Sequence, residues 1–229
     1  MLKSVDDVTA AELLTAYDGS DLKLLAGCAP CQTFSLYNQK ADSSDKRWWL
    51  LLQFSRLIRE TKPELVTMEN VPGLIYQDVF KKFVDELVKS NYHIDYKVVN
   101  CAEYGLPQQR KRLVLLASKL GPITLLSSKQ LHRKRKTVMD AIGTLPPIEA
   151  GQRDSKDPLH QCPRLYDINY QRMLASKPGG TWRDWPQELV AYCHKKKRCT
   201  TFPTVYGRRR WAQLPPTITT QVFGFSNGR

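Results

Sequence analysis

Hydrophobic positions in the first half of the chain alternate between short apolar runs and longer stretches with helical periodicity. The short runs predict strands, and the longer stretches predict helices between them. In chain order the predicted elements are a strand at Leu22–Ala26, a helix at Trp48–Ile58, a strand at Leu65–Met68, a helix at Val79–Val88, and strands at Tyr96–Val99 and Leu113–Leu116. This order predicts an α/β fold with a parallel-rich, doubly wound sheet.

The pattern changes near Gly121, beyond which neither periodicity is clear. Turn-forming pairs interrupt this part of the chain at Pro146-Pro147, at Gly179-Gly180 and at Pro215-Pro216. We therefore predict two domains, an α/β domain over residues 1–120 and a smaller, irregular domain over residues 121–229.

Composition places the chain among ordinary globular proteins. Of its 229 residues, 41% are hydrophobic and 25% are charged, which excludes disordered and collagen-like classes. No apolar run approaches the roughly 20 residues that a membrane span requires. The acidic pair Asp6-Asp7 follows the first residues, so the sequence predicts neither a membrane anchor nor a signal peptide. A cytoplasmic location is expected.

The formal charge of +13 is concentrated in the second half. Residues 1–120 contain 16 basic and 15 acidic side chains, whereas residues 121–229 contain 19 basic and 7 acidic ones. The basic residues form runs at Arg133–Lys136, Lys195–Arg198 and Arg208–Arg210, with tryptophans and tyrosines among them. Such a pattern favours nucleic-acid binding, although a solvated basic face or an acidic protein partner would also fit. Charge does not distinguish DNA from RNA.

Six cysteines without a secretory signal indicate reduced thiols. The pair Cys28 and Cys31 follows the first predicted strand, at the strand end where chemistry gathers in open α/β sheets. A redox pair should open a helix, but the following residues are polar and loop-like. A zinc site needs two more ligands, and the remaining histidines and cysteines lack the usual spacing. A single nucleophile, Cys31, is the favoured interpretation.

Two further groups complete a candidate active site. Glu69 ends the next predicted strand, and neighbouring strand ends can meet over one pocket. Arg110 and Arg112 precede a later strand and share a face if that stretch is extended. Taken alone, each could be a solvated surface charge. A thiol, a carboxylate and two guanidinium groups together suit covalent attack on an electrophilic ring carbon, protonation of a ring nitrogen and binding of a ring carbonyl.

These residues, in this order, resemble the conserved motifs of DNA (cytosine-5)-methyltransferases. The similarity rests on Pro30-Cys31-Gln32, Glu69-Asn70-Val71 and Gln108-x-Arg110-x-Arg112. Asp7-Val8 resembles the short acidic motif after the strand that holds the adenine of the cofactor. The segments around Gly179–Asp184 and Trp211–Thr220 resemble the family's target-recognition domain.

The resemblance implies a Rossmann-like methyltransferase sheet and a role for each matching residue. Cys31 would add to cytosine C6, Glu69 would hydrogen-bond N3 and the exocyclic amine, and Arg112 would bind O2. Arg110 would support the thiolate, and Asp7 would bind the cofactor S-adenosyl-L-methionine. The supporting residues would be Pro30, Gln32, Asn70 and Gln108, with Thr217 and Ile218 among the elements that read the sequence of double-stranded DNA.

The resemblance also implies segments that this sequence does not contain. The family's glycine-rich cofactor loop and its final motifs are absent, so the sequence predicts an incomplete sheet, with a complementary chain or missing segments supplying the cofactor loop. Two alternatives remain open, a tRNA cytosine-5 methyltransferase and a catalytically inactive DNA-binding fragment. A cytoplasmic or nucleoid-associated protein without membrane contact is expected.

Overall fold

The computed structural model describes residues 3–29, 49–195 and 206–217. The chain divides into two compact units, one formed by Met1–Asn100 and Lys111–His132, the other by Cys101–Arg110 and Arg133–Arg229. The first unit thus extends beyond the predicted boundary at Gly121. Two hydrogen bonds tie Leu125 to β3 (His93–Asn100), from its backbone N–H to Asp95 Oδ2 and from Lys97 Nζ to its carbonyl, both 2.7 Å. The assignment of functions to the two units stays a prediction.

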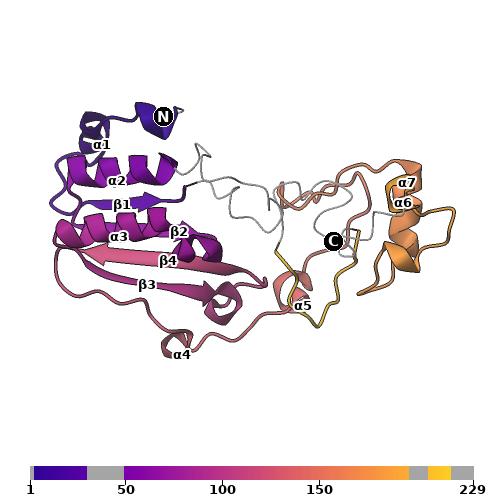
Figure 1. Cartoon of the computed structure of the whole chain (residues 1–229). Helices are drawn as coiled ribbons and strands as arrows, with labels where there is room; N and C mark the ends of the chain where they lie inside the picture. The colour runs from indigo at the N-terminus through magenta and orange to yellow at the C-terminus, as the bar shows by residue number, and fades with distance from the viewer. Residues whose placement is uncertain (1–2, 30–48, 196–205, 218–229) are drawn as a thin grey trace. The chain divides into compact units, whose positions relative to one another are not determined.

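Every strand and helix predicted in the first half is present with slightly different ends. The first unit contains a four-stranded sheet in the order β1-β2-β4-β3 (Figure 1). The strands are β1 (Leu24–Gly27), β2 (Leu65–Asn70), β3 and β4 (Lys111–Ser118).

Three of the four described strands, β1, β2 and β3, run in the same direction, as the prediction of a parallel-rich sheet requires, whereas β4 differs from it. β1 and β2 are parallel, but β4 is antiparallel to both of its neighbours. The connection Cys101–Arg110 between β3 and β4 explains part of this difference. It is shorter than the dozen or more residues that a parallel crossover needs, so β4 must return alongside β3 in the opposite direction.

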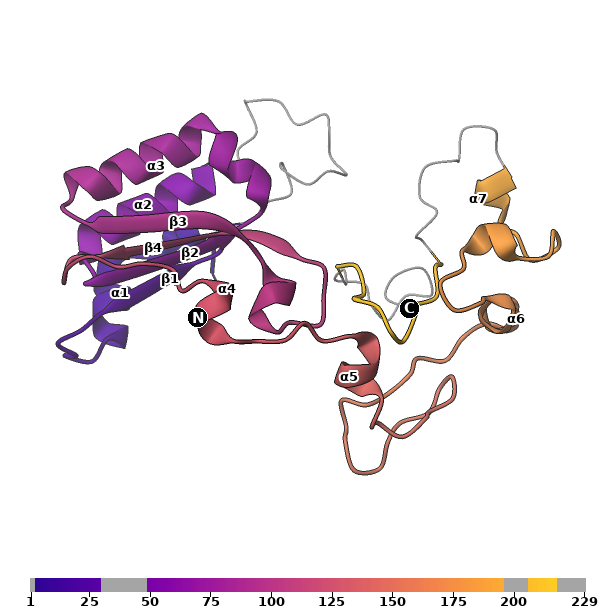
Figure 2. The ribbon, with the colours of Figure 1, turned by 90° about the horizontal axis from the view of Figure 1, so that it is seen from below.

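The hydrophobic core lies between the sheet and two helices, α2 (Trp49–Thr61) and α3 (Asp78–Lys89). Figure 2 shows both helices on the same side of the sheet. Alternate residues of β2 and β4 point into this core because side chains of a strand alternate between faces. The core includes Val66, Met68, Leu113, Leu115, Phe54, Phe80 and Phe83. The opposite face of β2 and β4 is therefore free to carry the polar side chains described below.

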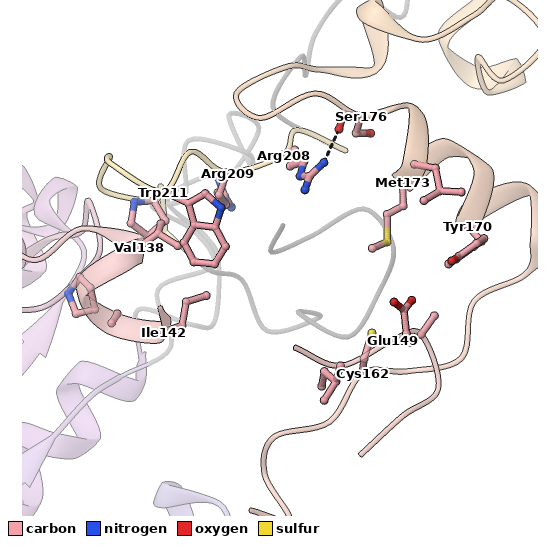
Figure 3. A pocket seen from close by; sticks show the side chains of 16 residues that line it. Val138, Ile142, Glu149, Cys162, Tyr170, Met173, Ser176, Arg208, Arg209 and Trp211 are labelled. Atoms are coloured by element: carbon pink, nitrogen blue, oxygen red, sulfur yellow. Dashed lines mark hydrogen bonds between the residues drawn. The ribbon is translucent and has the colours of Figure 1, made fainter. Parts of the chain in front are cut away.

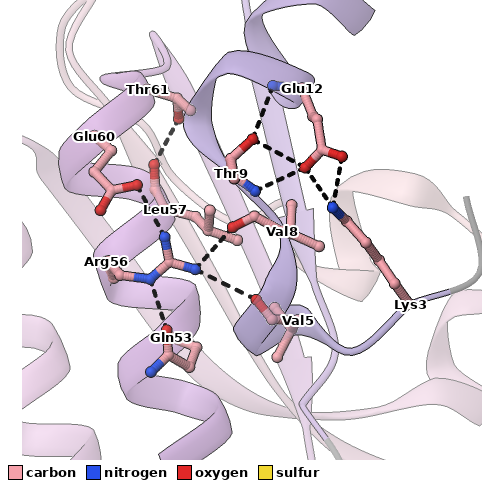
Figure 4. Close-up of polar contacts among 10 residues, drawn as sticks. All are labelled: Lys3, Val5, Val8, Thr9, Glu12, Gln53, Arg56, Leu57, Glu60 and Thr61. Atoms are coloured by element: carbon pink, nitrogen blue, oxygen red, sulfur yellow. Dashed lines mark hydrogen bonds and ion pairs between the residues drawn. The ribbon is translucent and has the colours of Figure 1, made fainter.

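The N-terminal segment is held against α2 by Arg56 (Figure 4). This segment contains a 3-10 turn, η1 (Val5–Asp7), and a short helix, α1 (Ala10–Ala16). The guanidinium of Arg56 donates to the carbonyl of Val8 at 2.9 Å and pairs with Glu60 within α2 at 3.0 Å. A capping box between Thr9 and Glu12 begins α1. Hydrogen bonds from Lys3 and Thr9 lower the pKa of Glu12 to about 2.

The remaining short elements are η4 (Pro72–Tyr76), α4 (Ser128–Leu131), η5 (Cys101–Tyr104), α5 (Val138–Ile142), α6 (Asp167–Ala175), η6 (Trp182–Asp184) and α7 (Tyr192–Lys195). The irregular character predicted for the second half is evident in the second unit. Trp185 is buried there, and its indole N–H donates to Ser176 Oγ at 2.8 Å. None of the helices in the described ranges is long and apolar enough to cross a bilayer.

Candidate functional site

The ends of β1 and β2 and the start of β4 bring three polar side chains together. Gly27 pairs with Met68, so the residues that follow them, Cys28 and Glu69, lie side by side. Cys28 Sγ donates a hydrogen bond to Glu69 Oε2 at 3.0 Å. Arg112 Nε contacts Glu69 Oε1 at 2.5 Å. The predicted carboxylate therefore lies between a thiol and a guanidinium.

Strand register explains the contact between Glu69 and Arg112. Glu69 pairs with Val114, and Arg112 lies two residues before Val114 on the same face of β4. This face is opposite the core. The Arg112 side chain is 15% exposed and that of Glu69 is 40% exposed. The charge-assisted contact thus fixes one carboxylate oxygen while the group stays accessible to a ligand.

Asn70 connects the end of β2 to the chain that leads to the predicted nucleophile. It is only 3% exposed. Its Nδ2 donates to the carbonyl of Ala29 at 3.1 Å, and its Oδ1 accepts from the backbone N–H of Val71 at 2.9 Å. Asn70 thereby fixes the backbone at Ala29. Three residues with predicted roles follow directly, Pro30, Cys31 and Gln32, and they lie outside the described residues.

The other predicted substrate-binding residues belong to the second unit. Thr217 Oγ1 donates to the carbonyl of Gln109 at 2.9 Å, and the N–H of Gln109 donates to the carbonyl of Pro215 at 2.8 Å. The structure therefore joins the segment containing Gln108 and Arg110 to the segment containing Thr217. Ile218 lies outside the described residues.

The two predicted arginines belong to different units. β4 begins at Lys111, so its alternation of side chains places Arg112 but does not extend to Arg110. Arg110 is half-buried, and its carbonyl accepts a hydrogen bond from the N–H of Cys101 at 2.8 Å. A shared face for the two guanidinium groups stays a prediction.

Asp7, the predicted cofactor ligand, is exposed at the end of η1. The resemblance places the matching motif after a strand, but in the part of the chain that the structure describes no strand precedes Asp7. The 3-10 turn forms because Ser4 caps it, accepting a hydrogen bond from the N–H of Asp6. Its role toward the cofactor stays a prediction.

Sequence reasoning treated Cys28 as incidental and did not assign Gln109 or Pro215. The signal for Cys28 was its position at the same strand end as Cys31, next to the strand that ends at Glu69. No local signal marked Gln109, because its partners lie more than 100 residues away. Within the described ranges, no group of three His, Cys, Asp or Glu residues could hold a metal ion.

The second unit contains an apolar cavity of about 670 Å³ (Figure 3). Its walls come from α5, α6 and the segment that contains Arg208, Arg209 and Trp211. The Arg208 side chain is held there by a hydrogen bond from Nη1 to the carbonyl of Ser176 at 3.0 Å. Volume and lining are typical of a ligand pocket, but none of the described catalytic candidates lines it.

Comparison with known proteins identifies, over nearly the whole chain, the family that the sequence motifs resemble. The family model described as C-5 cytosine-specific DNA methylase matches residues 3–225. The Type II methylase M.HgiDII of Herpetosiphon aurantiacus is 45% identical over 99% of this chain and 65% of its own length. The Type II methyltransferase M.XorII of Xanthomonas oryzae pv. oryzae is 32% identical over 95% of this chain and 47% of its own length. The chain thus spans about half to two thirds of these relatives.

The fold agrees with a solved structure of a DNA modification methyltransferase encoded within an E. coli prophage. The similarity has a TM-score of 0.64 at 21% identity and covers 94% of this chain and 68% of that one. It supports the Rossmann-like α/β fold class that the sequence predicts, now with mixed strand directions.

Proposed function

Because the chain belongs to the C-5 cytosine-specific DNA methylase family, we propose that it transfers a methyl group from S-adenosyl-L-methionine to C5 of cytosine in double-stranded DNA. The two Type II relatives support a role in a restriction-modification system. The observation that carries the proposal is the Glu69–Arg112 pair beside the backbone that Asn70 fixes just before Cys31.

The proposed reaction begins with addition of the Cys31 thiolate to C6 of the cytosine. Addition breaks the aromaticity of the ring and moves an electron pair toward C5. Glu69 hydrogen-bonds N3 and relays a proton to it, for which its 40% exposure to solvent is suited. Arg112 stabilises the negative charge that develops on the ring carbonyl O2.

S-adenosyl-L-methionine, when bound, supplies an electrophilic methyl group to C5. Loss of the C5 proton to a base then expels the Cys31 thiolate and restores the aromatic ring. Among the described residues, the exposed Asp7 carboxylate is suited to accept a hydrogen bond from the adenine amine. The target base must leave the duplex stack for Cys31 to reach C6; DNA methyltransferases are themselves an established example of such base flipping.

Duplex DNA is proposed as the substrate in preference to tRNA. The support is the family description, which names DNA as what the methylase modifies. The excess of basic residues in the second half supplies the charge that a phosphate backbone requires.

Methyl transfer from labelled S-adenosyl-L-methionine to mixed-sequence duplex DNA tests the proposal. Transfer is expected with the unaltered chain and should be lost in Cys31→Ser. The matched control is Cys193→Ser, which removes an exposed thiol of the second unit and should leave transfer intact. Added tRNA serves as a competitor in the same assay. If it receives the labelled methyl group and suppresses labelling of the DNA, the RNA substrate is favoured instead. DNA binding without any transfer would indicate the inactive DNA-binding alternative.

A further inference from the structure

A small concave site in the second unit has the features of an anion-binding pocket. It has a volume of about 220 Å³ and is lined by two chain segments, Gly179–Thr181 and Gly207–Arg210, together with Gln213–Pro216. This volume equals roughly seven times the share that one water molecule occupies in the liquid. Three consecutive arginines line it, and none of the described residues in its lining is acidic.

Backbone hydrogen bonds hold the two main segments together. The N–H of Gly179 donates to the carbonyl of Arg208 at 2.9 Å, and the N–H of Arg208 donates to the carbonyl of Gly180 at 3.2 Å. The pocket is therefore built by residues that pair with each other, which fixes the backbone from which the arginine side chains extend.

The three arginines differ in their surroundings. Arg208 is tied to the carbonyl of Ser176. Arg209 is half-buried, and burial lowers the pKa of its guanidinium. Arg210 is exposed. Within the described ranges no carboxylate forms an ion pair with any of them, so their charge is available to a ligand.

Gly179 explains how the Arg210 side chain comes to lie along the glycine turn. Its φ is +78°, and a Cβ at this position would lie 1.9 Å from Arg210 Nε. The absence of a side chain thus leaves the space that the guanidinium occupies. One carboxylate, that of Asp184, lies beside this turn, where it accepts a hydrogen bond from the N–H of Thr181 at 2.7 Å, so the three arginines leave an excess of positive charge.

We propose that the pocket formed by Gly179–Thr181 and Arg208–Arg210 binds one backbone phosphate of duplex DNA and so anchors the second unit independently of base sequence. This inference rests on DNA being the proposed substrate. A phosphate contact of this kind positions a protein on DNA, whereas base contacts determine sequence preference.

Equilibrium binding of the 229-residue chain to duplexes of several sequences, between 50 and 200 mM salt and without methyl donor, tests the proposal. Arg210→Gln should weaken binding to all sequences by a similar factor. Affinity falls as salt rises, and losing one phosphate contact makes the slope of log affinity against log salt less steep by about 0.9. The ratio of the affinity at 50 mM salt to that at 200 mM salt therefore falls by about 3.5-fold. Arg153→Gln, which removes an exposed arginine of the same unit outside the pocket, is the charge-matched control.

A second pair of variants tests the geometry without changing the charge. Gly179→Ala should displace Arg210 and weaken binding to all sequences. Gly151→Ala is the control, because Gly151 also has a left-handed φ, of +85°, but a Cβ there would lie 3.6 Å from its nearest neighbour. Both alanines therefore carry similar backbone strain, and only the first one fills the space of the guanidinium.

Three outcomes would overturn the proposal: Arg210→Gln behaving like Arg153→Gln, Gly179→Ala behaving like Gly151→Ala, or a loss confined to one sequence with an unchanged salt slope. The last result would identify a base contact. The assay separates this proposal from the catalytic one, because a chain that binds DNA through this pocket but transfers no methyl group would contradict only the proposed activity.

Discussion

Replacing Asn70 by alanine should affect both stability and methyl transfer. The side chain is 3% exposed and makes two hydrogen bonds, to the carbonyl of Ala29 and from the N–H of Val71. Each lost bond contributes about 1 kcal/mol, and the lost burial adds up to about 1 kcal/mol, so the free energy of unfolding should fall by about 2–3 kcal/mol. For a chain of this length this corresponds to a decrease in Tm of roughly 4–12 °C.

The catalytic effect should exceed what instability explains. Once the backbone at Ala29 is released, the chain loses this anchor two residues before Cys31, and misplacing a reacting group lowers kcat by up to about 100-fold. Urea unfolding followed by circular dichroism measures the first effect, and labelled methyl transfer well below Tm measures the second.

Ser118→Ala is the matched control for Asn70→Ala. Ser118 is equally buried, loses one hydrogen bond, from the N–H of Leu120, and lies at the other end of the β2–β4 pairing. It should lower stability by about 1 kcal/mol and leave kcat unchanged. Equal kcat values for Asn70→Ala and the unaltered chain would refute the positioning role of Asn70.

Three other predictions follow from contacts elsewhere in the first unit. Gly27→Ala should lower the free energy of unfolding by about 1–3 kcal/mol, because the new Cβ would lie 2.6 Å from the buried Phe54 ring. In urea titrations this loss should be smaller when Phe54→Leu is already present. If the losses of the two single variants simply add up in the double variant, the clash is contradicted. Glu69→Gln should reduce methyl transfer by about 10²- to 10⁴-fold with little change in DNA affinity, whereas an unchanged rate would exclude Glu69 from proton transfer. Glu12 has its pKa lowered from 4.5 to about 2, so its ionised form stabilises the fold above about pH 5, and this contribution disappears as the pH falls toward 2. Unfolding midpoints of the unaltered chain and Glu12→Gln should therefore converge with acidification, and a constant gap would argue against this linkage.

Local sequence patterns predicted the elements of the first unit well, because their apolar spacing reflects a core on one side of a sheet. The pattern at Leu65–Met68 is one example, since Val66 and Met68 face that core. Strand direction was harder to predict, because the direction of β4 depends on the length and path of its connection to β3 and not on its own residues.

The candidate site shows the same division between local and distant information. Glu69 could be placed at a strand end from its neighbours in sequence. Its contact with Arg112 required the register of β2 and β4, and the hydrogen bond between Thr217 and Gln109 joins segments far apart in the chain. Such long-range pairings leave no periodic pattern in the sequence.

The assignment of Cys101–Arg110 to the second unit, although β3 precedes it and β4 follows it, has a consequence for recombination between relatives. The chain leaves the first unit after Asn100, returns at Lys111 and leaves again after His132. A single genetic crossover near Arg133 would therefore combine a new second unit with the old Gln109, whose backbone must pair with Pro215 and whose carbonyl must accept from Thr217. Because Gln109 contributes only backbone groups, an exchanged unit keeps these contacts if it again brings a carbonyl at position 215 and a hydroxyl at position 217 to the connection, so those two positions determine which second units the old connection accepts.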